Sequence, residues 1–228
     1  MSLIAIIPAR GGSKRLPRKN VLPILGKPML TYPIYAAQNS KMFDRIIVST
    51  EDDEIRNAAL EAGAEVFQRP DELAGDRAKV VQVCKQVLDV LREQGETPAY
   101  FCCIYATAVF VSPEDLTNSF QFFNQDPSPD VVMGVSEFNL QPVQALEEKE
   151  GFLTPKWPEY ISLQSQFQPK LTASNGTIYW ARTIYFEQNP SFYCARLKGY
   201  PIPRQRAIDL DTQEDLDYAR CVAEKILS

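Results

Sequence analysis

Short apolar runs alternate with helical patterns along most of this sequence, and this alternation constrains the fold more than any other feature. Five runs are typical of buried strands and cover residues 4–8, 45–50, 64–67, 100–105 and 131–135. The apolar spacing of amphipathic helices lies between them, at residues 29–39, 53–62, 80–93 and 113–124. Such alternation indicates βαβ units, so we expect an α/β fold with a doubly wound, mainly parallel, Rossmann-like sheet. Ligands bind at the carboxyl ends of the strands in such sheets, which directs attention to the loops after the first, second and fourth strands.

Residues 139–172 interrupt this rhythm with four prolines and a charged turn at residues 147–150. We interpret this segment as an inserted arm within a single domain that spans residues 1–228. The arm is too short to bury a core of its own, so we expect it to pack against a second copy of the chain and form a homodimer. A further strand at residues 176–181 and a helix at residues 211–226 complete the expected fold.

Composition excludes several classes of protein. The five cysteines are odd in number and contain no Cys-x-x-Cys pair, which argues against a disulfide framework or a zinc site and favours buried thiols. Histidine is absent, so a bound metal should be a hard ion held by oxygen atoms. No apolar run approaches the roughly 20 residues that cross a bilayer. We therefore expect a cytoplasmic protein that has no membrane partner.

Charge is distributed unevenly along the chain. Residues 1–43 carry seven basic side chains and no acidic one, whereas the remainder carries 17 basic and 29 acidic side chains. The N-terminal region should therefore attract anions on an otherwise acidic protein. A small polyanion fits this pattern better than a nucleic acid, because duplex binding usually needs a broad basic face.

The first strand runs into a basic loop at residues 9–20 that contains the pair Gly11 and Gly12. Glycines allow backbone N–H groups to approach an anion closely, and nearby cations neutralise phosphate charge. The spacing of a Walker loop is missing, and a generic Gly-Gly loop is more often a solvated basic turn. The pattern by itself therefore leaves the structural interpretation ahead of the functional one.

Resemblance to a known family favours the functional interpretation of this loop instead. The loop at residues 9–20, followed by Gly26-Lys27-Pro28, resembles the signature of the acylneuraminate cytidylyltransferase family. The segments at residues 49–55, 69–76 and 208–215 resemble further landmarks of the family in the same order, so the resemblance covers nearly the whole chain. Four features resemble its pseudaminic acid branch most, at residues 102–108, 157–159, 165–166 and 179–180.

The resemblance implies a nucleotide-diphospho-sugar transferase-like fold, CTP as donor, a magnesium or manganese ion, and a dimer made by the inserted arm. Catalysis would rest on Arg10, Lys14 and Lys19, with Lys14 or Lys19 nearest the reacting phosphate. The implied nucleotide-binding residues are Arg10, Gly11, Gly12, Ser13, Lys14, Lys19, Asn20 at the ribose, Arg69 near the base, and Asp76. Asp76 could instead cap the following helix. Tyr105, Gln166 and Tyr179 would contact the sugar.

Asp209 and Asp211 form a second candidate site. Two positions apart in an extended segment, their carboxylates project to the same side and could face one divalent ion. Asp211 could equally be a neighbour of a helix cap, since Thr212 to Asp215 has capping-box spacing. The resemblance places metal-binding aspartates here, and this favours the metal site. By contrast, the acids at residues 52–54 open a helix and are interpreted as structural support.

Departures from the family pattern bear on the sugar. Gln164 stands where an arginine that could pair with a sugar carboxylate is common, and Val109 replaces a common proline. Ser174-Asn175-Gly176 is closer to the sialic and legionaminic enzymes than to the pseudaminic branch. The predicted reaction is transfer of CMP from CTP to a nine-carbon acidic sugar, preferably pseudaminic acid, with release of pyrophosphate. The alternatives are legionaminic, sialic or deoxyoctulosonic acid as substrate, or a catalytically silent nucleotide-binding protein.

Overall fold

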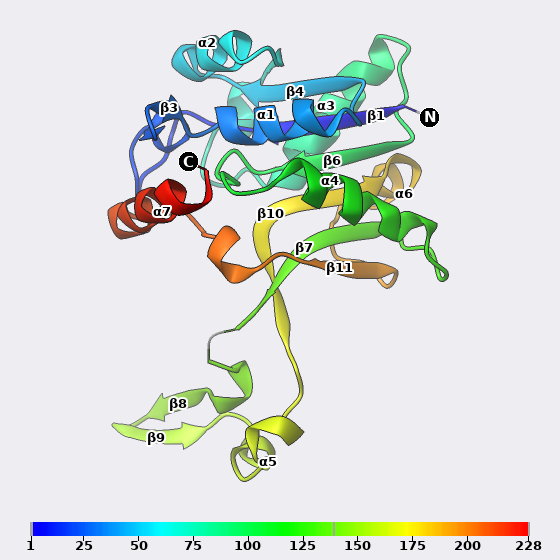
Figure 1. The fold of residues 1–228 in the computed structure, drawn as a ribbon. Helices are drawn as coiled ribbons and strands as arrows, with labels where there is room; N and C mark the ends of the chain where they lie inside the picture. The colour runs from blue at the N-terminus through cyan, green and yellow to red at the C-terminus, as the bar shows by residue number, and fades with distance from the viewer. Residues whose placement is uncertain (1, 139, 228) are drawn as a thin grey trace.

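A mixed β-sheet forms the centre of the molecule, as Figure 1 shows for a computed structural model that describes residues 2–138 and 140–227. Within those residues the sheet has seven strands in the order β11-β7-β10-β6-β1-β4-β5. The strands are β1 (Leu3–Pro8), β4 (Arg45–Thr50), β5 (Glu65–Gln68), β6 (Tyr100–Ile104), β7 (Val131–Glu137), β10 (Thr172–Arg182) and β11 (Leu197–Pro201). Among these strands only β10 runs antiparallel to its neighbours, so the described part of the sheet is mainly parallel, as predicted.

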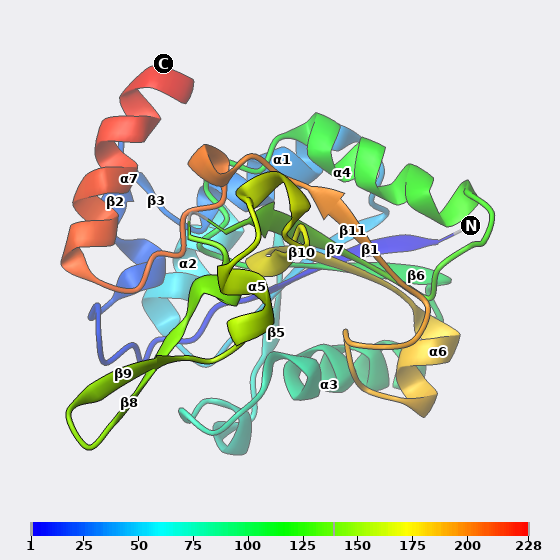
Figure 2. The same ribbon diagram turned by 90° about the horizontal axis from the view of Figure 1, so that it is seen from below.

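Helices cover both faces of the sheet, which confirms the doubly wound arrangement (Figure 2). One face packs against α1 (Thr31–Ser40), α2 (Asp53–Glu61) and α4 (Pro113–Phe120), and the other against α3 (Val80–Glu93) and α6 (Thr183–Gln188). The sequence explains why α3 lies where it does. Its buried residues recur every three or four positions, so they form one apolar stripe that faces the sheet: Val83, Cys84, Val87, Leu88 and Leu91.

A third apolar cluster lies beside the sheet and anchors the C-terminal helix α7 (Gln213–Ile226). The short hairpin of β2 (Pro23–Ile24) and β3 (Lys27–Pro28) contributes Ile24, and the loop after β1 contributes Leu16, which is 4% exposed. Leu210, in the segment before α7, and Leu216, near the start of α7, belong to the same cluster. The basic loop and the segment with the two aspartates therefore share one small core.

The predicted arm projects away from the body between β7 and β10 (Figure 1). It contains the hairpin of β8 (Leu146–Lys149) and β9 (Phe152–Pro155) and the short helix α5 (Pro158–Ile161). Asn139, where we placed the start of the arm, lies outside the described residues. The strands that carry the arm pair directly with each other, with Thr172 opposite Glu137.

The structure differs from the sequence expectations in several boundaries. The strand expected at residues 176–181 starts at Thr172, and the helix expected at residues 113–124 ends at Phe120 and continues as a 3₁₀ turn. The hairpin of β2 and β3, the edge strand β11 and helix α6 were not predicted. β11 is half-exposed and contains a glycine and a proline, so it lacks the apolar run that marks a buried strand.

Candidate active site

Five predicted residues from three separate segments line one pocket at the carboxyl edge of the sheet. The pocket has a volume of about 200 Å³ and is lined by Arg10, Lys19, Asn20, Arg69 and Tyr105, with apolar residues of β1 and α3 around them. Neighbouring parallel strands end at the same edge, so β1, β5 and β6 deliver their following loops to one place. The loop after β5 belongs to this site although the sequence argument pointed to the loops after the other strands.

An adjoining hollow of about 280 Å³ holds most of the remaining charged candidates. Arg10 and Lys14 form ion pairs with Asp76 at 2.7 and 2.5 Å. Hydrogen bonds from Lys14 and Arg10 hold the pKa of Asp76 below its usual range. Asp76 does not cap the next helix, because α3 begins at Val80 with Lys79 in the N-cap position. The cations predicted to hold phosphate are thus paired with a carboxylate in this structure.

Lys19 lies between the two hollows and lines both. Its ammonium group is 3.0 Å from Asp211 Oδ1, and Arg15 pairs with the other oxygen of the same carboxylate at 2.6 Å. Only 18% of the Lys19 side chain is exposed, so its charge is partly shielded from water and acts more strongly on a bound group. Ser13 lines the second hollow beside these cations.

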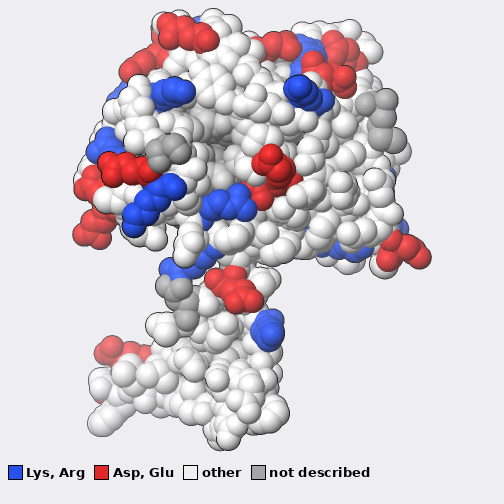
Figure 3. All heavy atoms as spheres, viewed as in Figure 1, with Lys and Arg blue, Asp and Glu red and all other residues white. Residues whose placement is uncertain are grey.

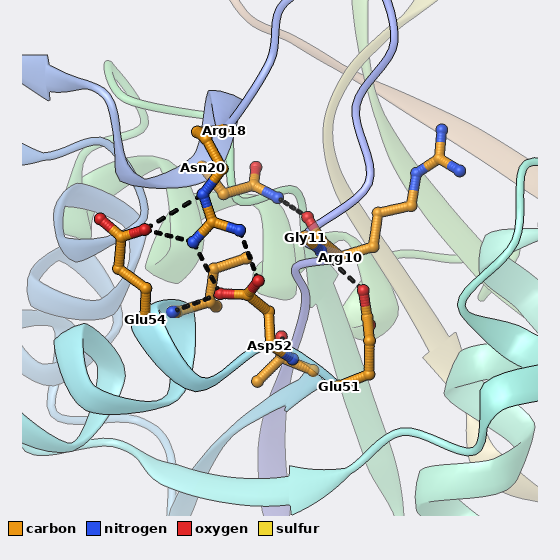
Figure 4. A network of polar contacts seen from close by, with 9 residues as sticks. Arg10, Gly11, Arg18, Asn20, Glu51, Asp52 and Glu54 are labelled. Carbon is orange, nitrogen blue, oxygen red and sulfur yellow. Dashed lines mark hydrogen bonds and ion pairs between the residues drawn. The ribbon is translucent and has the colours of Figure 1, made fainter.

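The two glycines of the loop have different reasons to be glycine. A Cβ on Gly11 would meet Asp52 Oδ2 at 2.5 Å, whereas a Cβ on Gly12 would meet no atom within 4 Å. The Gly11 N–H donates to Glu51 Oε1 at 2.7 Å (Figure 4). This corrects part of our interpretation: that N–H donates to a carboxylate of the protein itself and is not free to approach a bound phosphate. Gly11 allows close packing on the segment after β4.

We expect Gly11→Ala to lower activity at least tenfold, because the methyl group must displace Asp52 and with it the loop that carries Lys19. A tenfold loss corresponds to an increase of about 1.4 kcal/mol in the activation free energy. Thermal melting of Gly12→Ala is the control for folding, since its methyl group meets open space. Steady-state rates of Gly11→Ala and of wild type measure the loss of activity. A wild-type rate for Gly11→Ala would contradict this prediction.

Arg69 gives the pocket a buried positive charge. The residue is 3% exposed, its Nη2 donates to the carbonyl of Ser49 at 2.7 Å, and its Nε lies 3.8 Å from Glu51 Oε2. Burial lowers the pKa of Arg69, and the nearby charge of Glu51 opposes that shift. The apolar residues Val80 and Val83 line the same pocket. A buried donor beside an apolar wall is suited to the polar edge and flat face of a nucleobase.

The three predicted sugar contacts occupy different places. Tyr105 lines the pocket, and burial raises the pKa of its hydroxyl well above the usual value. Tyr179 is buried behind it, with ring centroids 5.3 Å apart and its hydroxyl 2.6 Å from Ser174 Oγ. Gln166 is exposed on the arm and donates to Gln164. Within one chain, therefore, the structure brings Tyr105 and Tyr179 to the site but not Gln166.

Asp209 and Asp211 form the candidate metal site. The pKa of Asp209 is raised, first by partial loss of solvent and then by the negative charge of Asp211, so the two carboxylates act on each other. Asp211 faces the hollow with the cations, whereas Asp209 lines a neighbouring hollow beside Tyr218. The described residues contain no cluster of three or more His, Cys, Asp or Glu side chains that could hold a metal. Two carboxylates suit a hard ion such as Mg²⁺, which keeps waters and takes phosphate oxygens as further ligands.

The alternative interpretation of this segment is also partly correct. Thr212 is the N-cap of α7 and forms a capping box with Asp215, whose carboxylate also accepts the backbone N–H of Asp211. The cap fixes the backbone of Asp211 and leaves its carboxylate free to face the cations. Upstream, Arg206 forms an ion pair with the buried Asp115 and so ties this segment to α4.

Sequence reasoning missed two side chains beside the site, Glu51 and Arg18. Glu51 holds the Gly11 N–H, and Arg18 bonds with Asp52 and Glu54 at the start of α2 (Figure 4). Asp52 also caps α2, as the structural interpretation of these acids predicted. The sequence contains the charges, with acids after β4 and a basic loop after β1, but their contact depends on the two strands being parallel neighbours.

Three of the five cysteines are buried, but Cys194 is half-buried and Cys221 is exposed, so the expectation of buried thiols holds only in part.

None of the described helices is both long and apolar enough to cross a membrane.

Comparison with known proteins decides the family. Residues 4–224 match the family model described as cytidylyltransferase. The chain belongs to the cytidylyltransferase family. Family membership makes it a nucleotidyltransferase and confirms the resemblance read from the sequence.

Its relatives include proteins that act on acidic sugars. The chain is 32% identical to the pseudaminic acid cytidylyltransferase of Campylobacter jejuni subsp. jejuni serotype O:2, over 96% of this chain and 95% of that protein. It is 29% identical to the CMP-N,N'-diacetyllegionaminic acid synthase of Legionella pneumophila, over 94% of this chain and 93% of that protein. A solved CMP:2-keto-3-deoxy-manno-octonic acid synthetase complexed with CTP shares the fold, with a TM-score of 0.70, 16% identity and 99% of each chain covered.

Proposed function

We propose that this cytidylyltransferase transfers CMP from CTP to the anomeric hydroxyl of a nine-carbon acidic sugar, with pseudaminic acid as the preferred substrate, and releases pyrophosphate. The observation that carries the proposal is the convergence of Arg10, Lys19, Asn20, Arg69 and Tyr105 on one pocket. Full-length similarity to a relative named for pseudaminic acid supports the choice of sugar. We place the reaction in the cytoplasm.

In this proposal each side of the pocket has its own task. Arg69 and the apolar wall receive the base, Asn20 the ribose, and the basic loop the triphosphate. The sugar hydroxyl attacks the α-phosphorus in line with the bond to pyrophosphate. That bond breaks, and pyrophosphate leaves with the bonding electrons. Arg10, Lys14 and Lys19 stabilise the charge that grows on the phosphate oxygens. Since the chain has no histidine, the hydroxyl proton leaves to a carboxylate such as Asp211 or to water.

Asp209 and Asp211 would hold the divalent cation, which supplies further charge neutralisation at the phosphates. Binding of the nucleotide would also exchange partners. Lys14 would leave Asp76 and Lys19 would leave Asp211, so that both cations could contact phosphate and the carboxylate of Asp211 would be available to the ion. The ion pairs therefore keep the cations ordered until the substrate arrives, which lowers the cost of organising the site.

The structure also bears on the sequence feature that weighed against pseudaminic acid. The amide of Asn175 donates to Ser136 Oγ at 3.0 Å and accepts from Thr177 Oγ1 at 2.6 Å. Both ends of this amide are thus used inside the protein, next to the bulge where β10 shifts its pairing with β7. Asn175 shapes that strand and is not a free sugar contact, so its identity argues less against pseudaminic acid than the sequence suggested.

A pyrophosphate-release assay tests the proposal. Purified protein is given CTP or ATP with magnesium, and separately pseudaminic, legionaminic, sialic and deoxyoctulosonic acids. We expect release with CTP only, fastest with pseudaminic acid, and loss of activity in excess chelator. Turnover with ATP at the same rate would refute the donor, and full activity without a divalent ion would refute the metal. Absence of release with every acid would favour the silent nucleotide-binding alternative.

The arm is the proposed contact of a homodimer. It exposes large apolar side chains, among them Leu140, Phe152, Leu153 and Phe167, which are 63% to 80% exposed. The lower end of the arm is largely free of charged side chains in the view of Figure 3. A surface of this kind usually marks an interaction site. Gln166 lies on the arm and does not line the pocket of its own chain, so its predicted sugar contact would be made in the pocket of a second copy.

We expect wild-type protein to sediment at about twice 25.8 kDa, and a variant with Phe152→Asp and Leu153→Asp to sediment as the monomer at micromolar concentration, because two charges would be buried in the contact. Ile184→Asp on α6 is the control, since that residue is 69% exposed on the body. A wild-type monomer in sedimentation would count decisively against the proposed dimer.

A further inference from the structure

Arg18 stands in the basic loop but is directed away from the nucleotide pocket. Its Nη2 donates to Asp52 Oδ1 at 2.9 Å and its Nε to Glu54 Oε2 at 3.1 Å, so one guanidinium bridges two carboxylates (Figure 4). Among the described residues that line the two hollows, Arg18 does not occur. Hydrogen bonding to Asp52 and Glu54 raises the pKa of Arg18, and the same contact lowers the pKa of Asp52.

The segment after β4 that holds Arg18 also holds the other end of the loop, through a different acid, Glu51. β1 and β4 pair in parallel with Pro8 opposite Ser49, so the segment after β4 runs beside the loop after β1. Glu51 accepts the N–H of Gly11, and Asp52 packs where a side chain on Gly11 would lie. The segment therefore fixes the loop at Gly11 and again at Arg18. The residues between these points include the cations of the second hollow.

Arg18 has a backbone conformation that non-glycine residues seldom adopt. Its φ of 59° lies in the left-handed region, and the short 3₁₀ helix at Lys19–Val21 begins at the next residue. Such a conformation persists when the surrounding contacts over-determine it, and it is found most often at functional sites. The turn at Arg18 sets the direction of Lys19, which lines both hollows, and of Asn20, which donates to the carbonyl of Arg10 at 2.9 Å.

We propose that Arg18 is a positioning residue of the reaction: clamped by Asp52 and Glu54, it fixes the turn that presents Lys19 and Asn20 to CTP, without touching the nucleotide. The inference rests on the proposed use of CTP. A guanidinium suits this role better than an ammonium group, because lysine is a point charge that lacks the planar fork. We call the contact of Arg18 with Asp52 and Glu54 the Arg18 clamp.

Three variants separate the clamp from other roles of these residues. Asp52→Asn removes the charge that holds Arg18 but keeps a good N-cap for α2. Arg18→Gln removes the clamp and keeps the backbone strain, whereas Arg18→Gly removes the clamp and relieves that strain. Arg45→Gln is the matched control, because Arg45 also bridges two carboxylates, Glu65 and Glu96, at the opposite end of β4.

Kinetics of pyrophosphate release give the first readout. We expect Arg18→Gln, Arg18→Gly and Asp52→Asn each to raise KM for CTP and to lower kcat, so that kcat/KM falls about thirtyfold, while Arg45→Gln stays within twofold of wild type. The double variant of Arg18→Gln and Asp52→Asn should be no worse than either single variant, because both remove one contact. Arg18→Lys should restore part of the loss.

Hydrogen exchange of the backbone amides at residues 19–22 gives a readout that does not depend on turnover. Loss of the clamp should speed exchange there at least tenfold, and Arg45→Gln should leave it unchanged. Faster exchange with unaltered kinetics would overturn the positioning role, and so would normal activity of Arg18→Gly. Unchanged exchange in the Arg18 variants would overturn the clamp itself. If wild-type protein releases no pyrophosphate from CTP, the proposed function fails, and with it the assignment to CTP, whatever the exchange shows.

Discussion

Replacing Lys19 with alanine is expected to lower kcat about a hundredfold, equivalent to about 3 kcal/mol of lost transition-state stabilisation. The ammonium group lies where both hollows meet, so in the proposed complex it faces the phosphate oxygens on which charge develops. Charge stabilisation that grows toward the transition state affects kcat more than KM. Pyrophosphate release at saturating CTP and sugar measures the effect.

Folding should change little in this variant, because Lys19 lies outside the sheet and, within the described residues, pairs with one carboxylate, that of Asp211. Lys85→Ala is the control, since Lys85 likewise pairs with one carboxylate, Asp89 at 2.7 Å, on the exposed side of α3. Similar melting of the two variants with a rate loss confined to Lys19→Ala is the expected pattern. A normal rate for Lys19→Ala, or loss of activity through unfolding alone, would show that Lys19 is assigned wrongly.

Asp211→Ala should also cut turnover about a hundredfold at limiting magnesium, because it removes one of the two carboxylates proposed to hold the ion. Excess magnesium should recover part of the rate, since a weakened site fills again when the ligand concentration rises. Lys19→Ala should show no such recovery. A magnesium titration of pyrophosphate release therefore distinguishes a lost metal ligand from a lost lysine.

The fold of the Asp211 variant should persist, since Thr212 and Asp215 still cap α7. Asp217→Ala on the exposed face of the same helix is the control for loss of a carboxylate that pairs with an arginine, here Arg220. If Asp211→Ala keeps its rate when magnesium is scarce, the metal is held elsewhere. An equal effect of Asp217→Ala would point to the stability of α7 instead.

The parallel part of the fold could be predicted from the sequence because its strands are buried on both faces of the sheet. Such strands are continuous apolar runs, and the bounds predicted for β4 and α3 agree with the structure. β10 was harder to predict. Its direction is set by the return of the chain from the arm, and its N-terminal half carries polar residues such as Ser174 and Asn175 that belong to a bulge.

The site was predictable where the family resemblance named single residues, and less so where packing decides. Arg10, Asn20, Arg69 and Tyr105 meet in one pocket as expected. The roles of Glu51 and Arg18 depend on which strand lies beside which, and on the register between β1 and β4. No local pattern contains that information. The need for glycine at position 11 is equally hidden from local sequence, because it comes from a contact with Asp52, some forty positions away.

The arm leaves the body through β7 and returns through β10, and these strands are adjacent and antiparallel, with Thr172 opposite Glu137. In evolutionary terms the arm is the tip of one long hairpin. Residues can be added to such a tip or deleted from it while every strand keeps its register, and each doubling of loop length costs only about 0.6 kcal/mol. Descendants of one ancestor can thus exchange their contact surfaces by small insertions and retain an unaltered nucleotide pocket. The same junction offers an engineer a place to graft a foreign recognition loop.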